Sequence, residues 1–264
     1  KVQKGLRPAS IHSYRDVLKL FLNQIAARRH CPITRLEPAD LTAEAVLAFL
    51  QSLEVTRGNQ IRTRNQRLAA LRTFYRYLAS RAPELLAEAA RVEAIPIKRT
   101  PPPPTCYLER DEIQQVLAGV ATRTPLGQRD HAILTVMYNT GARVQEIADL
   151  RVGDVDLNGP YRVRLHGKGD KWRACPLWPE TAQELRQLDT VGTGDPATPL
   201  FRSRLGRPMT RFGLYKVVKR HTAQLANRRA DNGAVRRLSP HVVRHTTAVH
   251  LLEAGVDVNV IRGW

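Results

Sequence analysis

The first hundred residues carry apolar side chains at helical spacing, in segments separated by short polar turns. Between residues 10 and 28 the apolar positions recur every three or four residues, and Ser10 stands at the N-cap position of the predicted helix. The same spacing predicts helices over residues 42–53 and 59–80, and a short fourth helix that begins at Pro83. Four short helices joined by polar turns are typical of a compact helical bundle.

The pattern changes in the second part of the chain, where helical segments flank one segment of alternating polarity. Residues 162–177 alternate apolar and polar positions around Gly167 and Gly169, which predicts a β-hairpin. Helices are predicted over residues 108–121, 126–140, 179–189, 210–228, 240–255 and 257–263, with a short one after Gly141. The predicted fold class is therefore mainly α, with a small β-sheet or hairpin in the second part.

A proline run separates the two patterns. Residues 95–105 read Ile-Pro-Ile-Lys-Arg-Thr-Pro-Pro-Pro-Pro-Thr. Successive prolines cannot continue a helix and favour extended polyproline II, which makes a stiff spacer. We therefore expect a helical domain over residues 1–94, a proline-rich linker over 95–106 and a second domain over 107–264.

The charge balance indicates a polyanionic partner. The chain of 264 residues has 42 Lys and Arg against 24 Asp and Glu, a formal net charge of +18. Both halves are basic, since residues 1–106 carry 18 basic and 8 acidic side chains. A basic surface gains free energy when it releases the counterions condensed on nucleic acid. DNA is the leading partner, and a merely soluble surface or an anionic membrane surface is the alternative.

Other classes of protein fit less well. No apolar stretch approaches the ~18 residues that a membrane span needs, and the N-terminal residues carry no secretory signal. Three widely spaced cysteines indicate neither a disulfide framework nor a metal site, which fits the reducing cytoplasm. His241 and His245 are four residues apart, but Arg244 lies between them and the glutamate of a metalloprotease motif is missing. We expect no metal and no cofactor.

The predicted helix over residues 59–80 combines an apolar face with a dense set of arginines. No acidic residue lies between Arg57 and Arg81, whereas a solvated helix face normally mixes the two signs. The arginines without a local acidic partner are Arg57, Arg62, Arg64, Arg67, Arg72 and Arg76. We favour a face that contacts DNA, and a merely basic surface is the alternative.

Three short motifs in the second domain carry the candidate chemistry. Residues 140–146 read Thr-Gly-Ala-Arg-Val-Gln-Glu, which places an arginine at a helix start behind a glycine turn. Residues 166–171 read His-Gly-Lys-Gly-Asp-Lys, which puts an ammonium group at the tip of the predicted hairpin. Residues 239–245 read Ser-Pro-His-Val-Val-Arg-His, with an imidazole and a guanidinium on one helix face. Each motif is weak by itself, because such arginines and turns are common on protein surfaces.

In this order and spacing, the three motifs resemble those of the tyrosine recombinase family, which includes phage integrases and Xer-type proteins. The segments at 129–130, 200–201, 206–210 and 251–261 also look like connecting segments of that family. The resemblance covers residues 107–264 and extends more weakly to the first domain, which is similar to the family's helical core-binding domain. It implies a site-specific DNA recombinase of the bacterial cytoplasm or nucleoid, whose two domains form a C-shaped clamp on double-stranded DNA. It also implies a homotetramer on two DNA sites, or pairing with a related recombinase.

The chemistry of phosphoryl transfer gives the motif residues their roles. Cleaving a phosphodiester without metal requires neutralising extra negative charge, and bidentate guanidinium groups at Arg143 and Arg244 fit that task. Lys168 would protonate the departing 5′ oxygen, because neighbouring guanidinium charges lower an ammonium pKa. His241 would manage the proton of the nucleophile or bind a non-bridging oxygen.

Four further residues support this expected site. We expect Glu146 and His245 to act one shell behind the phosphate, although a plain helix ion pair is an alternative for Glu146. We expect Lys171 and Arg173, which follow the hairpin tip, to bind DNA.

By resemblance, the nucleophile is a tyrosine that becomes joined to a DNA 3′ phosphate. In the family this tyrosine follows the position that matches Arg244, behind a Leu-Gly-His-like segment. None of the seven tyrosines of this chain stands there, and Tyr215, the nearest, is expected to pack or to contact DNA. We therefore expect the C-terminal segment with the nucleophile to be missing from this sequence, which would bind DNA without cleaving it.

Two other functions stay open. A naturally truncated relative would occupy DNA sites without cutting them, and a type IB topoisomerase would use a similar set of Arg, Lys and His side chains. The two-domain arrangement and the motif spacing favour the recombinase. The sequence leaves open the target DNA sequence and whether the system is that of a phage, a transposon, an integron or chromosome-dimer resolution. It also leaves open whether the outcome is integration, excision, transposition or dimer resolution.

Overall fold

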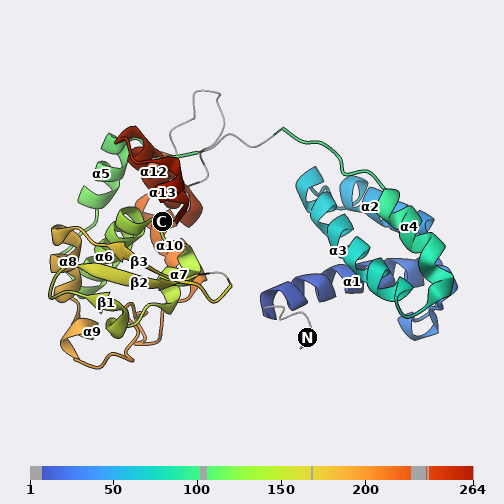
Figure 1. Ribbon diagram of the computed structural model, residues 1–264, viewed down its shortest axis with the longest axis horizontal. Helices are drawn as coiled ribbons and strands as arrows, with labels where there is room; N and C mark the ends of the chain where they lie inside the picture. Colours follow the sequence, from blue (N-terminus) through green and yellow to red (C-terminus); the bar gives the residue numbers. More distant parts are fainter. Residues whose placement is uncertain (1–7, 102–105, 168, 227–235, 237, 264) are drawn as a thin grey trace. The chain divides into compact units, whose positions relative to one another are not determined.

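The computed structural model describes residues 8–101, 106–167, 169–226, 236 and 238–263 (Figure 1). The chain divides into two compact units, Lys1–Pro103 and Pro104–Trp264, and each is described by itself. The described residues are mainly helical, with one three-stranded antiparallel sheet in the second unit. The predicted fold class, mainly α with a small sheet, is confirmed.

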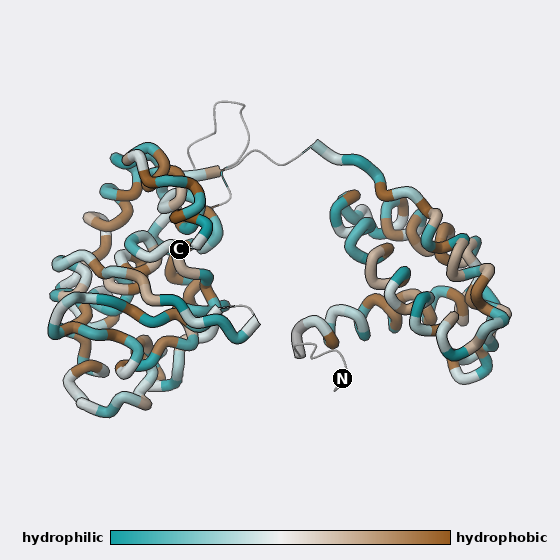
Figure 2. The backbone as a smooth tube through the Cα atoms, in the orientation of Figure 1, coloured by the Kyte–Doolittle hydropathy of each residue, from teal (hydrophilic) through white to brown (hydrophobic). Residues whose placement is uncertain are grey.

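The first unit is a helical bundle. Its helices are α1 (Pro8–Arg28), α2 (Ala43–Val55), α3 (Ile61–Ala79) and α4 (Leu86–Ala94), with single 3-10 turns at Ile33–Arg35, Pro38–Asp40 and Pro83–Leu85. Thr42 caps α2 by accepting a hydrogen bond from the backbone N–H of Ala45 at 3.1 Å. The apolar faces of the helices meet in one core, where the rings of Phe21 and Phe49 pack edge to face. Hydrophobic and hydrophilic positions alternate along these helices in Figure 2.

The first residues of the expected linker belong to this bundle. Arg72 donates a hydrogen bond to the carbonyl oxygen of Ile95, and Arg64 donates one to that of Pro96 at 3.0 Å. Asn65 pairs with the backbone of Lys98 through both of its amide atoms, at 2.7 and 3.2 Å. Hydrogen bonds from side chains of α3 thus hold residues 95–98 against that helix. The prolines at 102–104, which belong to the expected linker, lie outside the described residues.

The second unit surrounds one long buried helix. Its helices are α5 (Arg110–Ala118), α6 (Pro125–Thr140), α7 (Val144–Asp149), α8 (Pro179–Arg186), α9 (Asp189–Gly192), α10 (Arg211–His221), α11 (Ala223–Ala226), α12 (Pro240–Glu253) and α13 (Val258–Gly263). Along α6, apolar side chains from Ala132 to Met137 are buried on nearly every side, so the helix forms the centre of the core. Helix α12 packs against α6, which brings two of the candidate motifs together.

The predicted β-hairpin is confirmed. Strand β2 (Arg162–His166) pairs antiparallel with β3 (Trp172–Pro176), and a short strand, β1 (Val155–Asp156), adds to β2 behind a 3-10 turn at Val152–Asp154. Val163, Leu165 and Cys175 point into the core, whereas His166 and Trp172 are exposed on the other face. Sequence periodicity missed β1 because a two-residue strand has no repeat to detect.

The predicted helices differ from the structure at three places. Helix α1 begins at Pro8, so Ser10 lies in its first turn and is not the N-cap residue. The predicted helix over residues 210–228 is divided at Thr222 into α10 and α11, and α9 was not foreseen. Within the described residues, no helix has the length and hydropathy that crossing a bilayer requires.

Candidate active site

A glycine turn between α6 and α7 carries the first candidate arginine. Gly141 ends α6 in the left-handed conformation, with φ of +56°, and Arg143 is the N-cap residue of α7. A Cβ atom at position 141 would lie 3.3 Å from the methyl carbon of Thr247 on α12, so this turn and α12 are in close contact. Arg244, one turn earlier on α12, donates a hydrogen bond to the carbonyl oxygen of Gly141. The structure therefore brings Arg143 and Arg244 to the two sides of one turn.

Glu146 is the buried carboxylate of this site. It accepts hydrogen bonds from the backbone N–H of Arg143 at 2.8 Å and from its guanidinium at 3.0 Å. Arg173 binds both carboxylate oxygens, at 3.0 and 2.7 Å. Burial by itself raises the pKa of Glu146, but the hydrogen bonds from Arg173 and Arg143 lower it to about 2. Glu146 is therefore ionised throughout the physiological range.

The guanidinium groups outnumber the carboxylate. Arg244 is partly buried, and the pKa of its guanidinium is lowered by burial and by the nearby charges of Arg143 and Arg173. Three cations around Glu146 leave the site with an excess of positive charge. Such an excess in a partly desolvated place favours an anion, and two separated guanidinium forks match a phosphate.

The two histidines of the third motif lie beside Arg244. His241 is exposed, and its ring packs edge to face on that of His245 with 4.3 Å between the centroids. The pKa of His245 is lowered by burial, then by His241 and Arg244, so its imidazole is neutral at physiological pH. His245 can accept or donate one hydrogen bond there without adding charge to the site.

Lys168 lies outside the described residues, but its neighbours pack against the site. The backbone N–H of Gly167 donates to the carbonyl oxygen of Lys171 at 2.7 Å, which closes the hairpin turn. A Cβ atom on Gly167 would stand 3.3 Å from Oε1 of Glu146 and 3.5 Å from a guanidinium nitrogen of Arg173. Lys171 itself is exposed. The turn therefore rests directly on the ion pair between Glu146 and Arg173.

Arg173 was expected to bind DNA, and the structure pairs its guanidinium with Glu146. Its side chain is 17% exposed, against 55% for Arg143. Sequence reasoning missed the pair because Arg173 and Glu146 are 27 residues apart in the sequence. The available signal was the alternation of the strand, which puts Arg173 on the inward face together with Cys175.

Three of the arginines without a local acidic partner nevertheless have partners on other segments of the chain. Arg64 is 4% exposed and bonds to the Pro96 carbonyl, with Glu54 at 3.5 Å. Arg72 bonds to the Ile95 carbonyl, and Arg76 forms a two-point ion pair with Glu93. The partners come from other segments of the first unit, which a search along one helix cannot find.

The remaining basic residues of that region differ in exposure. Arg57 and Arg62 are exposed, and no ion pair or side-chain hydrogen bond joins either to another of the described residues. Arg67 is partly buried, and the pKa of its guanidinium is lowered by burial and by the charge of Arg57. Arg57 and Arg62 are therefore the two side chains of the predicted set that are free to meet a phosphate.

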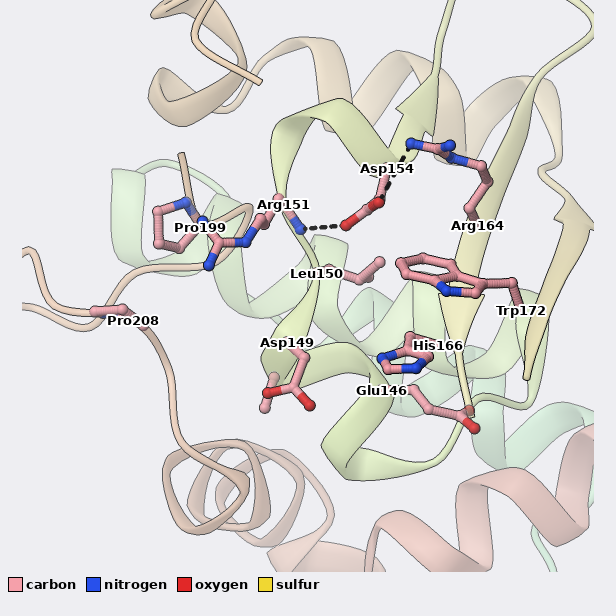
Figure 3. A pocket seen from close by; sticks show the side chains of 11 residues that line it. Glu146, Asp149, Leu150, Arg151, Asp154, Arg164, His166, Trp172, Pro199 and Pro208 are labelled. Carbon is pink, nitrogen blue, oxygen red and sulfur yellow. Dashed lines mark hydrogen bonds and ion pairs between the residues drawn. The ribbon is translucent and has the colours of Figure 1, made fainter. Parts of the chain in front are cut away.

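A pocket of about 440 Å³ adjoins the candidate site on the outer face of the sheet (Figure 3). Figure 3 shows the rings of His166 and Trp172 face to face beside Glu146, and their centroids are 4.6 Å apart. Arg164 lies 3.6 Å from Asp154, which also accepts a hydrogen bond from the backbone of Arg151 at 3.0 Å. Arg164 and Asp154 are thus paired along this pocket, whereas Glu146, which also lines it, is paired with Arg143 and Arg173.

A second buried carboxylate stabilises the unit away from these arginines. Asp130 on α6 is 2% exposed and accepts hydrogen bonds from Arg129, Arg220 and His221. Because Arg220 and His221 lie at the end of α10, this cluster joins α10 to α6. Its geometry indicates a structural role.

Comparison with known proteins gives consistent matches over the chain. Residues 106–263 match the phage integrase family, and residues 1–82 match the phage integrase N-terminal SAM-like domain. The putative integrase/recombinase y4rC of Sinorhizobium fredii is 36% identical over 263 residues, which are 99% of this chain and 79% of that protein. Tyrosine recombinase XerC of Pelobacter propionicus is 31% identical over 271 residues, covering 99% of this chain and 82% of the relative.

Solved structures share the fold. The XerH site-specific recombinase bound to difH substrate, in a pre-cleavage complex, aligns with a TM-score of 0.73 at 23% identity, over 97% of this chain and 73% of that one. A lambda integrase dimer bound to a COC′ core site aligns with a TM-score of 0.67 at 15% identity, over 98% of this chain and 88% of that one.

Proposed function

Because the chain belongs to the phage integrase family of tyrosine recombinases, we propose that it binds a specific site in double-stranded DNA and holds the scissile phosphate between Arg143 and Arg244. The observation that carries this proposal is the turn after Gly141. There, Arg244 bonds to the Gly141 carbonyl while Arg143 begins the next helix, and Glu146 compensates only part of their charge. A phosphodiester that enters the pentacoordinate state gains negative charge, which such preorganised cations stabilise.

The proposed reaction needs no external energy. The tyrosine oxygen attacks phosphorus, the bond from phosphorus to the 5′ oxygen breaks, and the 3′ phosphate stays on the tyrosine. His241 accepts the tyrosine proton or binds a non-bridging oxygen, and Lys168 gives a proton to the departing 5′ oxygen. Attack by a 5′ hydroxyl of a second DNA duplex reverses these steps and exchanges the strands. Bond energy is conserved because each phosphodiester is replaced by a phosphotyrosyl ester.

We propose that the nucleophile is none of the tyrosines within residues 1–264. The hydroxyl of Tyr138 is hydrogen-bonded to Nδ1 of His250 at 2.8 Å, and Tyr75 is in the core of the first unit, where burial raises its pKa. Tyr215 is partly exposed on α10, a helix that precedes the motif with His241. Residues 1–264 would then bind DNA without cleaving it.

The proposed assembly follows the family. Two protomers would occupy one recombination site and four would join two sites, or a related recombinase would supply half of them. Relatives whose structures are described as bound to difH substrate or to a core site support a DNA partner. We further propose that the exposed Arg57 and Arg62 contact the DNA backbone. The protein would act on chromosomal or mobile DNA in the cytoplasm.

The test is a suicide substrate. A binding site is selected from a random duplex library, and a nick is placed beside the mapped position so that cleavage traps a covalent complex. The full-length protein should form this complex, whereas the Arg143→Ala and Arg244→Ala proteins should not. A complex that forms equally in either variant would overturn the proposed roles of the two arginines.

The same substrate separates the alternatives. Binding without any covalent complex, from the full-length protein, would support a DNA-binding relative that does not cut. Relaxation of a supercoiled plasmid that lacks the selected site would support a topoisomerase. A covalent complex formed by residues 1–264 alone would show that one of the seven tyrosines attacks after all.

A further inference from the structure

We propose that Arg173 is a positioning residue that occupies the Glu146 carboxylate so that the charge of Arg143 stays available to the DNA phosphate. The inference rests on the proposed function, since it takes Arg143 as a phosphate-binding group. It assigns Arg173 a task different from direct DNA contact. It also predicts that the strength of phosphate binding depends on Arg173, although this side chain does not touch DNA.

The two arginines use Glu146 in different ways. Arg173 engages both carboxylate oxygens through two guanidinium nitrogens, at 3.0 and 2.7 Å. Arg143 offers one guanidinium nitrogen at 3.0 Å, and its second contact with Glu146 comes from its backbone N–H. A bidentate guanidinium–carboxylate pair is stronger than a single contact and largely satisfies the carboxylate. Most of the guanidinium of Arg143 is therefore left for another anion.

Exposure separates the two arginines in the same sense. The Arg143 side chain is 55% exposed, whereas Arg173 is 17% exposed and Glu146 3% exposed. Arg173 lies on the inward face of β3, two residues before the buried Cys175. A Cβ atom at position 167 would lie 3.3 Å from Oε1 of Glu146, so the hairpin turn packs closely on this ion pair. Arg173 is thus enclosed by the strand, the turn and Glu146, away from an incoming duplex.

Removing Arg173 would leave a buried carboxylate with Arg143 as its nearest cation. Glu146 would then attract both guanidinium nitrogens of Arg143 and neutralise it, because an unpaired buried charge is strongly unfavourable. The pKa of Glu146 would also rise, since burial raises it and the bonds from Arg173 are the first of the causes that lower it. Below that raised pKa, Glu146 becomes neutral and releases Arg143.

Several other charged or titratable groups lie near Glu146. Arg143 lies on its own helix, Arg173 and Cys175 on β3, and Arg244 on α12. His166 and Asp149 line the pocket into which one edge of Glu146 opens. Arginines do not titrate in the physiological range, and burial raises the pKa of Cys175. The same histidines are present in wild type and in every variant, so a difference between these proteins reports Glu146.

The experiment measures how much one phosphate contributes to DNA affinity. Fluorescence anisotropy measures the dissociation constant of the selected duplex and of the same duplex with one neutral methylphosphonate. The methylphosphonate is tried at each position along both strands, and the position with the greatest effect is kept. The phosphate ratio is the dissociation constant of the methylphosphonate duplex divided by that of the unmodified duplex. It is measured at pH 5 and pH 8 for wild type, Arg173→Met, Arg173→Lys and the double variant Glu146→Gln/Arg173→Met.

Wild type should give the same large phosphate ratio at both pH values, apart from a contribution of the histidines that all four proteins share. For Arg173→Met, we expect the ratio to fall about ten- to hundredfold at pH 8, the loss of one charged hydrogen bond, and to rise again as the pH falls and Glu146 becomes protonated. Arg173→Lys should lie between, because an ammonium makes no bidentate pair. The double variant, which removes the buried carboxylate as well, should recover the ratio at both pH values.

Three outcomes separate the possible failures. An Arg173→Met ratio equal to that of wild type, or a loss that pH 5 and the double variant both leave uncorrected, would overturn the inference. If Arg173→Met does not fold, as judged by thermal melting, Arg173→Lys decides, and a wild-type ratio in it at pH 8 would overturn the inference. Retention of the wild-type ratio by Arg244→Ala would instead overturn the proposed function.

Discussion

The guanidinium of Arg244 donates a hydrogen bond to the carbonyl oxygen of Gly141, across 103 residues of sequence. This bond joins the helix that carries His241 to the turn that precedes Arg143. The positions of the two arginines are therefore not independent, because one is held by the backbone that begins the helix of the other. Changes at the turn should be felt at both.

Gly141→Ala should disturb the candidate site and the fold together. An alanine there would adopt φ of +56° and place its Cβ 3.3 Å from the Thr247 side chain. We expect a loss of about 2–4 kcal/mol in the free energy of unfolding, from left-handed strain and crowding. Gly206→Ala is the matched control, because Gly206 also has a positive φ but a Cβ there meets nothing within 4 Å.

Urea unfolding measures both variants, and anisotropy measures their DNA affinity. Gly206→Ala should lose only about 1–2 kcal/mol, the strain alone, and keep wild-type DNA affinity. Equal losses of stability in the two variants would show that contact between the turn and α12 contributes nothing.

The ionisation of Glu146 should give the fold a measurable dependence on pH. Its pKa is about 2 in the folded protein and 4.5 in its ordinary state, so the carboxylate stabilises the fold fully above pH 4.5. This stabilisation, about 3 kcal/mol, is lost as pH falls from 4.5 toward 2. Glu146→Gln should therefore be less stable than wild type at pH 7, with a difference that shrinks at acid pH.

Urea unfolding of both proteins between pH 7 and pH 3 measures this difference, and the other carboxylates cancel from it. A gap that stays constant over that range would mean that Glu146 does not titrate below its ordinary pKa.

Arg62 and Arg64 should separate DNA binding from stability within one helix. Arg62 is exposed, so Arg62→Ala should weaken DNA affinity and lower the slope of log affinity against log salt by about 0.9. Arg64 is buried on Glu54 and the Pro96 carbonyl, so Arg64→Ala should destabilise the first unit by about 2 kcal/mol. Salt titrations and thermal melts of both variants decide. An unchanged salt slope in Arg62→Ala would remove that residue from the proposed DNA contacts.

Asn65 should control access to the start of the linker. Its amide pairs with both backbone groups of Lys98, so Asn65→Ala should speed trypsin cleavage at Lys98. Thr73→Ala on the same helix is the control, because its hydroxyl bonds only to Ala69 within α3. The rates are read from the cleavage products by mass spectrometry. Equal rates in both variants and wild type would mean that the hydrogen bonds from Asn65 do not protect the peptide bond after Lys98.

Periodicity was sufficient to predict the longer helices and the β-hairpin, because those depend on repeats within a single segment. The helix over residues 59–80 is present as α3, and the alternation around Gly167 became β2 and β3. The partners of Arg64 and Arg173 could not be predicted in this way. Each bonds to a group on another segment, and its distance from that group is fixed only when the core has formed.

The motif order was informative where spacing along the chain was not. Arg143 and Arg244 were chosen from sequence patterns alone, and the structure brings both to the turn after Gly141. Lys168 stays a prediction. The predicted DNA-binding role of Arg173 also stays a prediction, whereas its inward position on β3 follows from strand alternation.

Cys175 offers a way to observe the hairpin at work. Its thiol is 1% exposed behind Arg173, and burial raises its pKa, so a thiol reagent cannot reach it in the closed sheet. Reaction at this cysteine would require β3 to separate from the core. With Cys31 and Cys106 replaced by serine, the alkylation rate of Cys175 measures how often β3, the strand next to the Lys168 turn, opens locally. Bound DNA should lower this rate.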